Sequence, residues 1–140
     1  MSFNHTYFID RALGKSVGKA LQNLGVKIEF HHQHFSPNSA DTEWLPIVSQ
    51  KGWIILTKDS NIGRNILEIK AMAYSNAKVF TFVSANLNTA KMISIFEEAM
   101  PKIDNFATSN PSPFIAKVYK DANVKLWKNH HQLKKFLKQQ

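Results

Sequence analysis

Short apolar runs alternate with amphipathic stretches along most of this chain. Four apolar runs have the length of buried strands, namely residues 6–10, 26–30, 53–57 and 78–83. The stretches between them place apolar residues at helical spacing. This β-α-β-α-β-α-β order predicts an α/β fold of the Rossmann-like kind, in which helices cover both faces of a mostly parallel central sheet.

The predicted helices cover four segments: residues 15–23, a short helix that begins at Asp41 or Thr42 and runs to Ser49, residues 62–75, and residues 89–100 with an end near Pro101. A polar turn is expected at 105–113. Residues 114–119 and 124–127 then alternate like an antiparallel pair. We expect one domain over residues 1–140, with a lysine-rich C-terminal segment from about residue 114.

Three carboxylates stand where apolar runs give way to loops or helix starts. Asp10 ends the first predicted strand, Asp59 follows the third, and Glu43 lies in the first turn of a predicted helix. Because parallel strands end at the same edge of a sheet, these acids are expected to converge there and to bind a hard cation such as Mg²⁺ or Mn²⁺. The alternative for each acid is an ordinary helix cap or an interaction with a helix dipole.

The net charge of +8 is concentrated near the C-terminus. Residues 117–140 hold seven lysines against one acid, Asp121, which gives +6. Such a segment favours a polyanion such as RNA, with Lys134 and Lys135 as candidate contacts, and a solvated helix that aids solubility is the alternative. Closer to the acids, Lys58 and Arg64 are candidate phosphate-binding residues and Arg11 is a weaker one, whereas Glu68 has the spacing of an ion pair with Arg64.

Several classes of protein are disfavoured by what the sequence lacks. The absence of cysteine excludes disulfides, thiolate zinc sites and thiol nucleophiles. The sequence contains no glycine-rich phosphate loop and no serine-hydrolase elbow. No apolar run approaches the roughly 20 residues that span a bilayer, and the first residues do not resemble a signal peptide. We therefore expect a cytoplasmic protein without membrane contact.

Three motifs in order along the chain resemble one protein family. They are Phe8-Ile9-Asp10-Arg11-Ala12-Leu13-Gly14, then Asp41-Thr42-Glu43-Trp44-Leu45-Pro46 after His34-Phe35, and then Gly52-Trp53-Ile54-Ile55-Leu56-Thr57-Lys58-Asp59. They resemble the PIN-like domains of the VapC toxin type, in the branch with Asp-x-Glu-Trp-Leu and Thr-x-Asp motifs. The resemblance covers about residues 6–83.

This resemblance implies a PIN-type ribonuclease in which Asp10, Glu43 and Asp59 are the acidic metal ligands. It also implies Mg²⁺ or Mn²⁺ as cofactor, RNA as substrate, and a toxin role with a cognate antitoxin as partner; a homodimer is compatible with it. Many PIN sites use a fourth acid shortly after the third. Here Ser60 and Asn61 follow instead, so Asn61, Ser60 or water is the expected fourth ligand.

Two other functions remain open at this stage. One is a catalytically weak or inactive PIN-like module that binds RNA or a protein partner. The other is an antitoxin-like or structural partner whose three tryptophans, Trp44, Trp53 and Trp127, form an interface.

Overall fold

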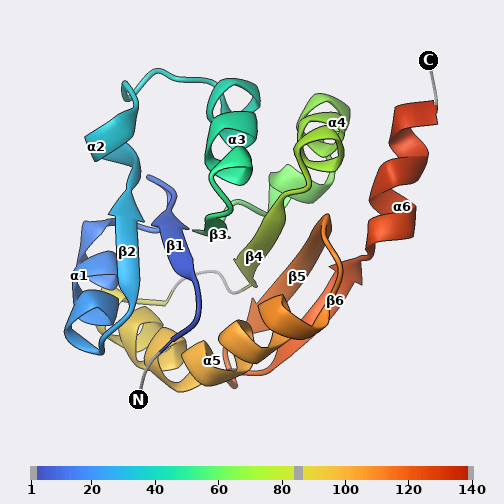
Figure 1. Ribbon diagram of the computed structural model, residues 1–140. Helices are drawn as coiled ribbons and strands as arrows, with labels where there is room; N and C mark the ends of the chain where they lie inside the picture. The colour runs from blue at the N-terminus through green and yellow to red at the C-terminus, as the bar shows by residue number, and fades with distance from the viewer. Residues whose placement is uncertain (1–2, 84–86, 139–140) are drawn as a thin grey trace.

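A six-stranded sheet forms the centre of the computed structural model, which describes residues 3–83 and 87–138 apart from the side chain of Ser60 (Figure 1). The strands are β1 (Thr6–Ile9), β2 (Lys27–Phe30), β3 (Ile54–Thr57), β4 (Lys78–Val83), β5 (Phe114–Tyr119) and β6 (Val124–Lys128). Their order in the sheet is β2-β1-β3-β4-β5-β6. The first five strands of this order are parallel, and β6 is antiparallel to β5. The α/β prediction is confirmed.

The helices form a layer on each face of the sheet. Their bounds are α1 (Lys15–Asn23), α2 (His31–His34), α3 (Asp41–Gln50), α4 (Ile66–Ser75), α5 (Thr89–Ser109) and α6 (His130–Lys135), with short 3-10 helices η1 (Ser60–Gly63) and η2 (Phe136–Lys138). Helices α1 and α5 pack in one buried cluster, and α3, α4 and α6 pack in the other. In β1, Tyr7 and Ile9 belong to the first cluster and Phe8 to the second, as strand periodicity requires.

Two helix predictions are wrong in their boundaries. Helix α5 does not end near Pro101 but continues to Ser109, so most of the expected polar turn is helical. Proline removes one backbone hydrogen bond from a helix interior. The helix continues because Met100, Ile103 and Ala107 are fully buried against the first cluster, and this packing outweighs the missing bond.

The segment after β3 is divided into two elements, although its sequence predicts one helix over 62–75. The 3-10 helix η1 ends at Gly63, and α4 begins at Ile66. Asn65 separates them because its side-chain oxygen accepts hydrogen bonds from the N–H groups of Leu67 and Glu68, which caps α4.

The lysine-rich segment completes the sheet and covers part of one face. Strand β5 pairs with β4, and the predicted antiparallel pairing of β5 with β6 is confirmed. Helix α6 packs on α4 through the fully buried Leu133. Within residues 3–83 and 87–138, no helix is long and apolar enough to cross a membrane.

Candidate active site

Asp10 and Asp59 lie at the same edge of the sheet. Their strands, β1 and β3, are parallel neighbours, so both acids emerge at the carboxyl end. The backbone N–H of Asp10 still donates to the carbonyl of Leu56, over 3.1 Å, which extends the pairing by one residue. The structure therefore brings together two of the acids that the strand pattern predicts.

Thr57 connects these two acids. Its hydroxyl donates to Oδ2 of Asp10 over 2.7 Å, and its oxygen accepts the backbone N–H of Asp59 over 3.1 Å. Asp59 in turn caps η1, because its Oδ1 accepts the N–H of Asn61 over 3.0 Å. A buried threonine at the end of β3 thus fixes the positions of one carboxylate directly and of the other through the backbone.

Helix α3 brings Asp41 to this edge and turns Glu43 away. The helix begins at Asp41, and residues two apart in a helix point in nearly opposite directions. Asp41 shares a face with Trp44, three positions later, which is buried and donates its indole N–H to Asp41 Oδ1 over 3.0 Å. Glu43 is exposed to solvent and lies outside the acidic group that the structure forms.

The fourth acid is Glu68 of α4. One oxygen each of Asp41, Asp59 and Glu68 lies within 4.8 Å of the others. Asp10 lies beside this group, because Asp10, Asp41 and Asp59 line the same cleft, which has a volume of about 340 Å³. Asn61, the expected fourth ligand, is exposed and contributes its backbone N–H to Asp59.

Sequence reasoning missed Asp41 and Glu68, although the helical pattern carried a signal for both. Asp41 precedes Trp44, Leu45 and Val48 at the spacing of a single helix face. Glu68 lies four residues before the buried Met72 on α4. Arg64 lies before the start of α4, so the four-residue helical spacing predicted between Arg64 and Glu68 does not apply. These two described residues form no ion pair with each other.

The crowding of carboxylates changes their acidity. Burial raises the pKa of Glu68 from 4.5 to about 7, and the charge of Asp41, a hydrogen bond with it, and the charges of Asp59 and Asp10 add to the effect. Burial also raises the pKa of Asp10, with further contributions from the charges of Asp41 and Asp59, while the hydrogen bond from Thr57 opposes this rise. The four acids therefore repel one another in the absence of a cation.

The donor set fits a divalent metal ion. Glu68 Oε1 is buried and has no hydrogen-bond partner among the described residues, so a buried acceptor is left without a donor. The candidate ligand atoms are all carboxylate oxygens. Oxygen-only sites select hard cations such as Mg²⁺ or Mn²⁺ over softer metals.

The comparisons with known proteins agree with this geometry. A family model described as a PIN like domain matches residues 6–84, which include all four acids. This chain belongs to the PIN-like domain family. The chain is also 27% identical, over 124 residues, to a protein of Mycobacterium tuberculosis (strain ATCC 25618 / H37Rv) that is assigned as ribonuclease VapC45. That alignment covers 85% of this chain and 89% of the relative, and it confirms the resemblance to the VapC type. No solved structure matches the chain significantly.

The candidate phosphate-binding residues of this PIN-like domain lie on several different elements. Arg11 follows Asp10, lines the acidic cleft, and donates a hydrogen bond to the carbonyl of Pro37. Lys58 precedes Asp59 and is exposed. The Arg64 guanidinium lies 5.5 Å from the centroid of the Trp127 ring. Lys134 and Lys135 are exposed in the last turn of α6.

The three tryptophans have packing roles in this PIN-like domain. Trp44 is fully buried, and Trp53 and Trp127 are half-buried against the cluster on the α3 and α4 face. Trp127 covers Gly63 of η1 and is also approached by Lys117, whose Nζ lies 4.2 Å from the ring centroid. Strand β6 thus supports the segment between Asp59 and Glu68.

Proposed function

We propose that this PIN-like domain is a metal-dependent endoribonuclease that hydrolyses RNA phosphodiester bonds with Mg²⁺ or Mn²⁺. The observation that carries the proposal is the convergence of Asp41, Asp59 and Glu68 within 4.8 Å, with Asp10 beside them at the edge of the sheet. A protein with a formal charge of +8 gathers four acids at this edge, three of them lining one cleft, and a bound cation would relieve their mutual repulsion.

Three of the acids share one role in the proposal, and the fourth completes the site. Asp41, Asp59 and Glu68 would hold the metal ion, and Asp10 would complete the site, with Thr57 keeping its carboxylate in place. Glu43, which the motif resemblance implies as a ligand, is replaced in this role by Asp41. When bound, the metal lowers the pKa of a water molecule and stabilises the negative charge that develops on the phosphate.

Basic residues next to the acids would bind the RNA backbone. Arg11 lines the cleft, and Lys58 is exposed directly before Asp59. Arg64 would bind a phosphate while its guanidinium lies over the Trp127 ring. Lys134 and Lys135 would add weak, sequence-independent attraction.

We further propose that the protein is the toxin of a toxin–antitoxin pair. The support is the relative assigned as ribonuclease VapC45, whose length the alignment covers almost completely. A cognate antitoxin protein would then be its partner, and the cytoplasm its place of action. Co-expression with the product of an adjacent gene tests this role, because a toxin should arrest growth when expressed alone and not when its antitoxin is present.

Cleavage of total RNA in Mg²⁺ or Mn²⁺ tests the nuclease proposal. We expect Asp59→Asn, Asp10→Asn and Asp41→Asn to abolish cleavage, because each change removes a charge at nearly constant shape. Glu43→Gln is the matched control and should retain cleavage. Retained cleavage in Asp59→Asn and Asp10→Asn would exclude the mechanism, and abolished cleavage in Glu43→Gln with retention in Asp41→Asn would restore Glu43 to the site.

A wild-type protein that cleaves no RNA in either metal would favour the alternative of an RNA-binding or protein-binding module. The measurement that separates the two is Mn²⁺ binding by calorimetry. An inactive module of that kind has no useful metal affinity, whereas the proposed enzyme binds the ion in the absence of RNA.

A further inference from the structure

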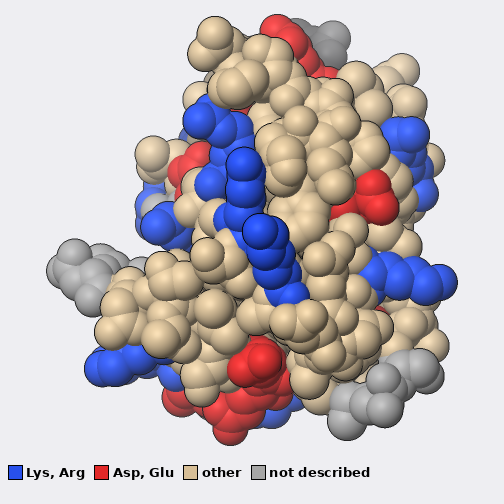
Figure 2. Space-filling view, turned by 90° about the vertical axis from the view of Figure 1, so that its left-hand side faces the viewer, with Lys and Arg blue, Asp and Glu red and all other residues tan. Residues whose placement is uncertain are grey.

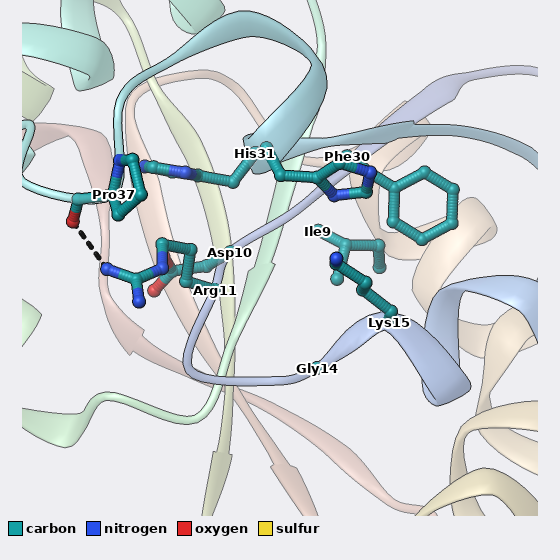
Figure 3. Close-up of a pocket in the computed structure, with 9 residues that line it drawn as sticks. Ile9, Asp10, Arg11, Gly14, Lys15, Phe30, His31 and Pro37 are labelled. Carbon is teal, nitrogen blue, oxygen red and sulfur yellow. Dashed lines mark hydrogen bonds between the residues drawn. The ribbon is translucent and has the colours of Figure 1, made fainter.

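A second pocket, of about 330 Å³, adjoins the acidic cleft on the side of α1 and α2 (Figure 3). It shares Asp10, Arg11, His31 and Pro37 with the cleft, so the two form a continuous depression. The family resemblance assigns no residue of its outer part. A pocket of this volume lies within the range of small-molecule sites.

The pocket holds two basic side chains beside the carboxylate of Asp10. Arg11 and Lys15 line it, and Figure 3 shows both below His31 and Phe30. Helix α1 begins at Lys15 with Gly14 as its N-cap, which supplies no side-chain hydrogen bond, so the first N–H groups of the helix lack a capping oxygen. Such groups attract phosphate. In Figure 2, which faces the side of α1 and β2, lysine and arginine side chains form a row.

His31 is an independent sign that the pocket receives a ligand. It lines the pocket, is only 3% exposed, and its Nδ1 has no hydrogen-bond partner among the described residues. Burial and the neighbouring Arg11 charge lower the pKa of His31, which favours the neutral imidazole, able to both donate and accept. The rest of the lining is mixed: Ile9, Phe30 and Pro37 are apolar, and Asp10, Gly14 and His32 complete it.

We propose that this pocket holds one nucleotide of the RNA, adjacent to the phosphate that is cleaved. Arg11, Lys15 and the N-terminus of α1 bind the phosphate of that nucleotide. His31 hydrogen-bonds its nucleoside, which packs against Pro37 on the same side of the pocket. This inference rests on the proposed function, since the nucleotide in the pocket would be part of the RNA that the enzyme cleaves.

The test is the binding of free nucleotides in EDTA, followed by ¹H–¹⁵N NMR of the full chain. The probes are adenosine and uridine 5′-monophosphates and inorganic phosphate. We expect the nucleotides to shift the backbone resonances of residues 15–17 and to bind more tightly than inorganic phosphate. Arg11→Ala with Lys15→Ala should weaken nucleotide binding about tenfold. The matched control is Lys19→Ala with Lys27→Ala, which removes two exposed charges outside the pocket and should leave binding unchanged.

A second comparison isolates the nucleoside contact. His31→Phe keeps a ring of similar size and removes the polar nitrogens, so it should reduce nucleotide affinity to that of inorganic phosphate. His34→Phe makes the same change at an exposed histidine that pairs with Glu29, and it should have no effect. Equal affinities of the wild type for nucleotides and phosphate, or an equal weakening of binding in the two charge-removing variants, would overturn the proposal.

These measurements require neither metal nor cleavage, so they separate the two proposals. A protein that binds nucleotides in this pocket but never cleaves RNA would contradict the nuclease function alone. A protein that cleaves RNA but binds no nucleotide here would overturn the pocket assignment alone.

Discussion

Replacement of Glu68 by glutamine tests whether the four acids form one electrostatic unit. The substitution removes a charge that burial and the neighbouring carboxylates disfavour, as the rise of its pKa from 4.5 to about 7 indicates. At about 1.36 kcal/mol for each pKa unit, the full shift corresponds to about 3 kcal/mol, and solvent screening of this partly exposed group reduces it to about 1–2 kcal/mol.

The pH dependence has a defined sign. Because the folded protein keeps the Glu68 proton to a higher pH than the unfolded chain, the contribution of this group to stability is fully present below pH 4.5. It disappears as the pH rises through about 7. Without metal, Glu68→Gln should therefore be more stable than the wild type above pH 7 by about 1–2 kcal/mol and should no longer have this advantage near pH 4.5.

Urea denaturation in EDTA at a series of pH values measures this difference. Glu43→Gln, the same change at an exposed position of α3, should follow the wild type throughout. Saturating Mn²⁺ should then stabilise the wild type at alkaline pH and stabilise Glu68→Gln less, because a ligand that binds only the folded state raises its stability. Parallel pH profiles for the wild type and Glu68→Gln would refute the reasoning.

Two further predictions concern residues on the β6 and α6 side. Lys134→Ala with Lys135→Ala should weaken RNA binding at low salt, as measured by fluorescence anisotropy. The slope of log affinity against log salt should become flatter by about 0.7 for each phosphate that the lysines neutralise in the wild type. An unchanged slope would assign both lysines to solubility alone. Gly63→Ala would place a Cβ 2.4 Å from Cζ3 of Trp127, so it should destabilise the fold by about 1–3 kcal/mol in urea denaturation. The same change should cost less in a Trp127→Leu background, and additive effects would show that the ring does not cause the destabilisation.

The amino-acid sequence alone was enough to specify the strands that build the sheet edge and two of the acids on it. Strand runs of this length and apolarity can only be buried in a sheet with helices on both faces, and Asp10 and Asp59 stand at their ends. Right-handed crossovers then place the ends of parallel neighbours side by side. The three motifs also indicated the family, which the match over residues 6–84 confirms.

Tertiary packing selected the helical acids that reach that edge. Asp41 and Glu43 are two residues apart, and the burial of Trp44 against the sheet selects the face that carries Asp41. Glu68 reaches the group because Asn65 starts α4 after a separate 3-10 turn and because α4 packs against α3. Such choices depend on helix rotation and on packing between segments distant in sequence, and a local pattern of residue types does not specify either.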